Sequence, residues 1–61
     1  MPEVIIELAA GRTLDQKRAL VKEITDAVVR NTGAPPDAVT VIIHETPLTD
    51  KAKGGVLFSE R

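Results

Sequence analysis

The start of the chain alternates between apolar and polar residues, which is the two-residue period of a β-strand. This pattern predicts a strand over residues 2–8. One face of it carries Val4, Ile6 and Leu8, and the other carries Ile5 between two glutamates. Residues 9–12 then make a short turn, because they include Gly11 and no longer alternate.

A longer period begins after this turn and predicts one α-helix, because apolar residues now recur every three or four positions. Thr13 is the expected N-cap, with Gln16 as its capping-box partner and Asp15 at the positive end of the helix dipole. The helix should run to about Asn31, and Gly33 should end it. Its apolar stripe consists of Leu20, Val21, Ile24, Ala27 and Val28, whereas Lys17, Arg18, Lys22, Glu23, Asp26 and Arg30 are expected to face solvent.

Alternation returns over residues 39–45 and predicts a second strand. Its two faces carry Val39, Val41 and Ile43, and Thr40, Ile42 and His44, respectively. After Pro47 the chain is polar, and Gly54-Gly55 then precedes a short apolar segment at residues 56–58. We expect this last segment to form a short strand or the arm of a hairpin.

The order strand, helix, strand predicts an α+β fold: a β-α-β unit with a right-handed crossover and a short C-terminal β-hairpin, in two layers. Residues 1–61 are expected to form a single domain, since no linker or repeat interrupts them. One helix covers only one sheet face, so Ile5 and Ile42 would remain exposed to solvent on the other face. A chain of 61 residues without Cys also has a small core and no disulfide. We therefore expect an oligomer.

Composition and charge exclude several classes of partner. Eight Lys and Arg residues oppose nine Asp and Glu residues, and one Phe is the only aromatic residue among Phe, Trp and Tyr. Nucleic-acid binding is not expected, because there is no basic footprint. No apolar run approaches the roughly 20 residues of a membrane span, and no secretory signal is recognisable. With no Cys and one His, no metal or other cofactor is expected. The absence of Cys fits any compartment, and the predicted location is cytoplasmic because no span or signal is recognisable.

Pro2 is the first candidate for chemistry. If Met1 is removed, Pro2 has a free secondary amine, and an apolar pocket or nearby cations would lower the pKa of such a group. An amine tuned in this way can act as a general base near neutral pH. If Met1 is retained, the Pro2 nitrogen is a tertiary amide and cannot be a base. Taken alone, Pro2 is more simply read as the first residue of an edge strand.

Other polar residues are weaker candidates. Arg12 directly precedes the capped helix, and a guanidinium suits a carboxylate, but a lone arginine is more often a surface residue. His44 has no evident partner, so an interface position is favoured over acid–base chemistry. The glutamates at the strand ends, Glu3, Glu7 and Glu45, are expected to be solvated.

In combination and in order, these features resemble the 4-oxalocrotonate tautomerase family, the small members of the tautomerase superfamily. The strongest stretches are Met1-Pro2, Gly11-Arg12-Thr13-x-x-Gln16-Lys17, and Glu45-x-Pro47 through Ala52-x-Gly54-Gly55. The resemblance implies a cofactor-free keto–enol tautomerase with Pro2 as the general base and Arg12 binding a substrate carboxylate. It also implies a homohexamer, a trimer of dimers, with active sites between subunits.

Two positions depart from the family pattern. Thr40 stands where the family has a second substrate-binding arginine, and Lys51 stands where it has an aromatic wall. Lys51 is a weak candidate for replacing the missing charge, because a compact ammonium does not copy a guanidinium fork. A small 2-hydroxydienoate or enol-pyruvate-type carboxylic acid is therefore as good a substrate candidate as the dicarboxylate muconates of the family.

Two alternatives stay open. The chain could be a catalytically weak or non-catalytic subunit that keeps the scaffold, including one subunit of a hetero-oligomer in which a partner supplies the missing cation. A hydratase or dehalogenase of a small unsaturated acid ranks lower, because no residue can be assigned to activate water.

Overall fold

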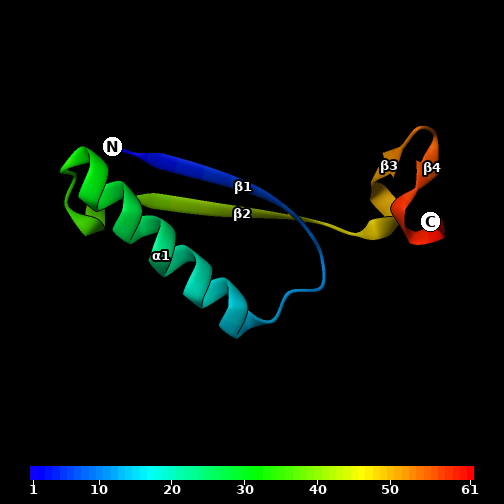
Figure 1. Ribbon diagram of the computed structural model, residues 1–61, viewed down its shortest axis with the longest axis horizontal. Coiled ribbons are helices and arrows are strands. Elements are labelled where there is room, and N and C mark those ends of the chain that lie inside the picture. The colour runs from blue at the N-terminus through cyan, green and yellow to red at the C-terminus, as the bar shows by residue number, and fades with distance from the viewer.

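The computed structural model describes all residues from Met1 to Arg61 as a strand pair, one helix and a separate C-terminal arm (Figure 1). Strand β1 spans Glu3–Ala9, helix α1 spans Leu14–Thr32 and strand β2 spans Thr40–Thr46. A 3-10 turn at Pro36–Ala38 joins α1 to β2. The C-terminal arm, residues 47–61, contains strands β3 (Ala52–Lys53) and β4 (Val56–Leu57), with 3-10 turns at Leu48–Asp50 and Phe58–Glu60.

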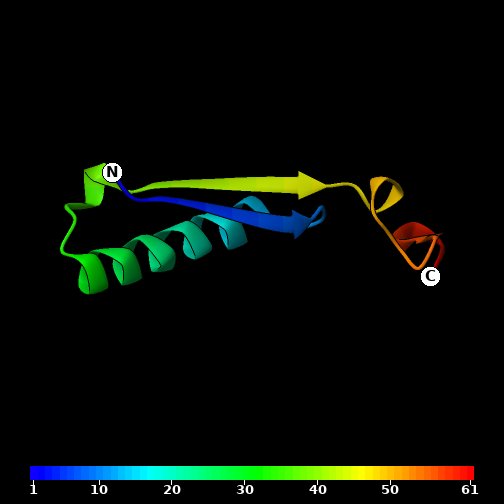
Figure 2. The ribbon, with the colours of Figure 1, turned by 90° about the horizontal axis from the view of Figure 1, so that it is seen from above.

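Strands β1 and β2 pair in parallel, with Glu3 opposite Thr40 and Ala9 opposite Thr46. Helix α1 lies against one face of this pair, as Figure 2 shows. The predicted β-α-β unit, its two layers and the C-terminal hairpin are therefore confirmed. We call the sheet face away from α1 the open face; it carries Ile5, Glu7, Ile42 and His44.

The ends of α1 follow the predicted capping chemistry. The Thr13 hydroxyl oxygen accepts from the Gln16 N–H at 3.1 Å, and Gln16 Oε1 accepts from the Thr13 N–H at 2.9 Å. This reciprocal pair is the capping box. At the other end, Gly33 takes a φ of 76°, and its N–H donates to the Val29 carbonyl at 3.0 Å. A glycine takes this left-handed conformation without the strain of a Cβ.

The strand and helix boundaries differ from the prediction by one residue, for identifiable reasons. β1 starts at Glu3 because Pro2 has no N–H for the ladder, although its carbonyl accepts the Thr40 N–H at 3.0 Å. β2 starts at Thr40 because the Val39 N–H donates to Pro36 within the preceding turn. Helix α1 includes Thr32, whose hydroxyl donates to the Val28 carbonyl at 2.7 Å.

The C-terminal arm is folded by its two-glycine turn. Gly54 and Gly55 have φ values of 62° and 84°, the double positive φ of a type I′ hairpin turn. The turn pairs Lys53 with Val56 and Ala52 with Leu57. A Cβ at either glycine would meet nothing within 4 Å, so the glycines serve the turn conformation and not a close approach of backbone. Phe58 was predicted in the last strand but begins the final 3-10 turn instead.

The isolated chain has no fully buried side chain. Its accessible surface of 4560 Å² exceeds the about 3,900 Å² expected for a compact 6.6 kDa monomer. Its radius of gyration is 14.6 Å, against about 10.5 Å for a compact chain of this length. Figures 1 and 2 show why: the C-terminal arm stands away from the helix and the sheet. A single chain therefore leaves much of its apolar surface uncovered.

α1, the longest helix, carries too many charged residues to cross a membrane, and no other helix is long enough.

Candidate functional site

Pro2 and Thr40 lie side by side at one end of the sheet, held by the hydrogen bond between the Pro2 carbonyl and the Thr40 N–H. Pro2 is partly buried, whereas Met1 is 97% exposed. The hydrogen bond therefore fixes the position of Pro2, whereas the Met1 side chain is almost wholly in solvent and contributes little packing. Of the four predicted site residues, these two are the pair that the strand ladder brings together.

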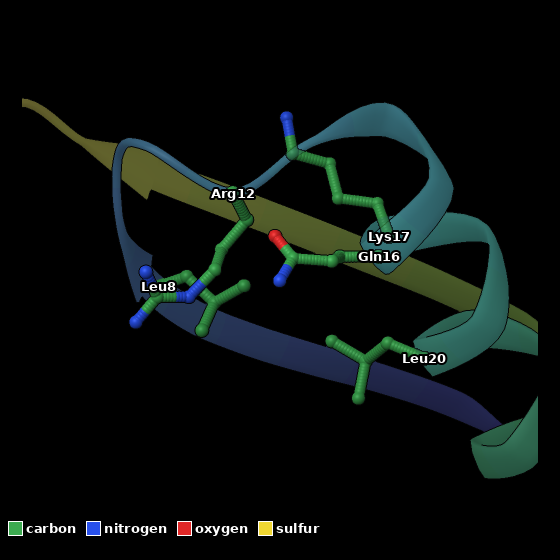
Figure 3. Close-up of a pocket in the computed structure, with 5 residues that line it drawn as sticks. All are labelled: Leu8, Arg12, Gln16, Lys17 and Leu20. Atoms are coloured by element: carbon green, nitrogen blue, oxygen red, sulfur yellow. The ribbon is translucent and has the colours of Figure 1, made fainter.

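Arg12 lies at the opposite end of β1, in the loop that leads into α1. It lines a shallow pocket, the Arg12 pocket, together with Leu8, Gln16, Lys17 and Leu20 (Figure 3). The guanidinium lies beside Leu8 in Figure 3, and no carboxylate lies within the 4.0 Å of an ion pair. An unpaired guanidinium next to apolar side chains is well suited to bind a carboxylate from a ligand.

The Arg12 pocket is too small to be a whole active site, and Pro2 is far from it. Its volume is about 190 Å³, below the roughly 300–1,000 Å³ that is usual for ligand pockets. The seven residues of β1 separate Pro2 from the Arg12 loop by roughly 23 Å, at about 3.3 Å per residue. This distance exceeds the length of a small carboxylic acid. A single chain therefore does not bring Pro2 and Arg12 to one substrate.

Lys17 was predicted to face solvent, and Glu45 to be solvated; Lys17 is instead partly buried, and Glu45, although exposed as a residue, has a side-chain partner. The Lys17 ammonium forms an ion pair with Glu45, and both side chains are largely covered, with 25% and 32% exposed. The pair joins the first turn of α1 to β2 beside the Arg12 pocket, and the Lys17 ammonium points away from Arg12 in Figure 3. Arg12 is therefore the one cation of the pocket that is free for a ligand.

His44 was predicted to have no evident partner, but the structure places it beside Glu7, which is exposed as predicted. The two residues stand opposite each other in the β1–β2 register, and His44 Nδ1 lies 3.0 Å from Glu7 Oε2. The pair lies on the open face, with both side chains more than half exposed. The residues are 37 positions apart, so this contact follows from the parallel register and from no local pattern.

Lys51 lies on the C-terminal arm, over the ring of Phe58. Its ammonium is 5.3 Å from the ring centroid, and the Arg61 guanidinium is 5.6 Å from the same centroid. Sequence reasoning did not identify Phe58 or Arg61. The signal was present in the Gly-Gly turn, whose two-residue register places position 51 next to position 58. No group of three potential metal ligands forms in the structure.

Comparison with known proteins decides the family. The family model described as "Tautomerase enzyme" matches residues 2–61, which is all of the chain after Met1. The chain belongs to the tautomerase family. The predicted resemblance is thus confirmed, and the family match begins at Pro2.

Relatives and solved structures agree with this tautomerase assignment. A probable tautomerase from Bradyrhizobium diazoefficiens is 48% identical over all 61 residues and 91% of its own length. A crystal structure of a 4-oxalocrotonate tautomerase homologue superposes with a TM-score of 0.94 at 38% identity, covering 100% of this chain and 97% of that one. A heterohexamer 4-oxalocrotonate tautomerase from Chloroflexus aurantiacus gives a TM-score of 0.88 at 30% identity, covering 98% and 97%.

The Lys17–Glu45 pair should stabilise this chain more than a fully exposed pair does. In a double-mutant cycle of Lys17→Met and Glu45→Gln, we expect a coupling of about 1 kcal/mol, the upper end of the range for surface pairs. The matched control is Lys22 and Asp26, an i,i+4 pair that is 76% and 52% exposed, for which we expect about 0.3–0.5 kcal/mol. Urea unfolding at one fixed protomer concentration measures both, and equal couplings would contradict the prediction.

Proposed function

We propose that this chain is a cofactor-free keto–enol tautomerase, with Pro2 as its general base and Arg12 of a neighbouring subunit as its carboxylate-binding residue. The observation that carries the proposal is the position of Pro2. It is the first residue of the family match, it is held at the start of β1, and the residue before it is 97% exposed. Removal of Met1 would leave a fixed secondary amine at this position.

The proposed reaction is an isomerisation that needs no co-reactant. The Pro2 nitrogen takes the proton from the 2-hydroxyl group of a small dienol acid, such as a 2-hydroxydienoate or an enol-pyruvate-type acid. As the O–H bond breaks, the C–O bond becomes a carbonyl and the double bonds shift along the chain. The protonated Pro2 then delivers the proton to a carbon of the same molecule. Arg12 holds the substrate carboxylate and draws electron density toward it.

Two physical observations favour an assembly in which subunits share the site. Pro2 and the Arg12 pocket lie a strand length apart, so one substrate reaches both only when the two residues come from different chains. The chain also exposes roughly 650 Å² more than a compact monomer would. That excess is close to the roughly 800 Å² that each partner buries in a standard interface. We propose a homohexamer as the assembly.

A second candidate is a subunit of a hetero-oligomer. Thr40, the neighbour of Pro2, has no charge, so this chain has no cation at the position of the family's second substrate-binding arginine. One solved relative is a heterohexamer, which shows that the fold accommodates different chains. In such an assembly the partner chain would supply the cation.

Blocking the Pro2 amine should abolish catalysis. We expect the chain that begins at Pro2 to ketonise a 2-hydroxydienoate or phenylpyruvate enol. The same chain with Met1 retained should be slower by about 10²-fold or more, because an amide nitrogen is no base. Pro2→Ala should lose most of the activity as well. Ultraviolet assays of enol decay measure the rates, and mass spectrometry verifies the first residue of each preparation. Unchanged activity in both altered chains would rule out Pro2 as the base.

Subunit sharing can be tested by mixing two inactive variants. Arg12→Ala should lower kcat/KM by about 10- to 100-fold through loss of the carboxylate contact. Arg30→Ala, which removes another unpaired arginine, is the control and should leave kcat/KM unchanged. When Pro2→Ala and Arg12→Ala chains are unfolded together and refolded, about a quarter of the sites should combine an intact Pro2 with an intact Arg12. No recovery of activity in the mixture would place both residues in one chain.

Native mass spectrometry distinguishes the two assemblies. The purified chain should form a stable homo-oligomer at micromolar concentration, with six copies expected. A chain that stays monomeric, or that assembles but shows no tautomerase activity until a second chain type is added, would favour the hetero-oligomer.

A further inference from the structure

The open face of the sheet carries a histidine–carboxylate pair beside an apolar patch. Ile5 lies opposite Ile42 in the register, and Ile5 is 56% exposed. Two positions further along the strands, His44 Nδ1 lies 3.0 Å from Glu7 Oε2, and both side chains are more than half exposed. A carboxylate oxygen only accepts hydrogen bonds, so the imidazole nitrogen is the donor. The pair therefore adjoins apolar surface that the single chain leaves in water.

Another copy of this chain is the occupant that the observations favour for the open face. Helix α1 already covers the opposite face (Figure 2), so the open face is the side of the sheet that still lacks a cover. The chain has no fully buried side chain and exposes roughly 650 Å² more than a compact monomer, close to the roughly 800 Å² that each partner buries in a standard interface. The face is mixed in charge and apolar at Ile5 and Ile42, so no strongly basic or acidic partner is indicated.

His44 is the group on this surface whose charge changes near neutral pH. The other titratable groups on the same side of the strands are Glu7 and Glu3, which stands opposite Thr40. A carboxylate keeps its charge between about pH 6 and 8, whereas an imidazole gains or loses its charge in this range. The charged side chains of α1 belong to the layer on the other face, and those of the C-terminal arm stand away from the strand pair (Figures 1 and 2).

We propose that association of this chain through the open face is linked to pH, with protonated His44 paired to Glu7 as the form that assembles best. This inference rests on the homo-oligomer proposed with the tautomerase function. When His44 is protonated, the pair has no net charge. When His44 loses its proton, Glu7 is left as an uncompensated charge that association removes from water, which is costly. Assembly therefore takes up protons: it is strongest below the range in which imidazole titrates and weakens as the pH rises through that range.

A dilution series at pH 6 and pH 8 tests this linkage. The protomer concentration at which half of the wild-type chains are assembled should rise roughly tenfold from pH 6 to pH 8, the factor for an uptake of about half a proton per chain over two pH units. Sedimentation velocity measures this midpoint concentration. Where dilution does not separate the subunits, the urea midpoint at one fixed protomer concentration makes the same comparison, and it should be lower at pH 8.

Two substitutions in the pair should change the pH dependence in different ways. His44→Gln keeps a hydrogen-bond donor for Glu7 but does not titrate, so its midpoint concentration should be the same at both pH values. Glu7→Gln leaves His44 without a carboxylate, and loss of water then favours the uncharged imidazole, so its midpoint concentration should fall as the pH rises. Glu23→Gln, at an exposed position of α1 without an ion pair, is the matched control and should keep the wild-type pH dependence.

The variants also isolate His44 from the terminal amine, which titrates in a similar range but is common to all of them. A wild-type midpoint that is equal at both pH values, or a pH dependence that His44→Gln retains, would overturn the proposal. If Glu7→Gln does not fold, His44→Gln still decides the result.

Activity assays on the same samples separate this linkage from the proposed function. pH-dependent assembly in a chain without tautomerase activity would overturn the function and leave the linkage standing. An active tautomerase whose assembly does not depend on pH would overturn the linkage alone. A chain that is monomeric at both pH values would overturn the linkage together with the proposed assembly.

Discussion

The parallel pairing of β1 with β2 is the interaction on which the remaining structure depends. Parallel strands need a crossover, and this chain has one helix to supply it, so one sheet face is covered and the other is left open. That geometry explains why no side chain is fully buried in the isolated chain. It also makes the separate chain an incomplete unit of stability, because about 25 cal/mol per Å² is gained only where apolar surface leaves water. Under the proposed assembly, folding and association of the chain would therefore be coupled.

The register of this strand pair also determines where the polar and charged side chains lie. In register, Thr40 comes beside Pro2 at one end, His44 comes opposite Glu7 near the middle of the open face, and Glu45 reaches Lys17 at the far end. At the Pro2 end, neither Pro2 nor Thr40 takes part in an ion pair. At the Arg12 end, the Lys17 ammonium is paired with Glu45, and the Arg12 guanidinium is unpaired. Under the proposed function, the Arg12 end of a chain would attract the substrate carboxylate, and Pro2 of a neighbouring chain would supply the base there.

Most of the fold could be predicted because its signals are local. The capping box of Thr13 and Gln16, the stop at Gly33 and the alternation of residues 2–8 each depend on neighbours within a few positions. The roles of Pro2 and Arg12 came from the family resemblance, because each residue taken alone favoured an edge-strand or surface position. Local patterns did not predict the contacts between side chains that lie on different helices and strands. Lys17–Glu45 and Glu7–His44 depend on the register of β1 against β2 and on where α1 docks, and neither is encoded within one segment. The contact of Lys51 with Phe58 was within reach, since a two-glycine turn fixes its own register.

The length of β1 has a consequence for how assemblies of this chain would fail. Under the proposed arrangement, each chain contributes its amine to one site and its guanidinium to another, because the two groups lie at opposite ends of a seven-residue strand. A chain that folds but lacks one of these groups would then impair one site, while its other group could still complete a site with an intact neighbour. In an assembly of this kind, a substitution in one chain would lower activity at a site that a neighbouring chain shares.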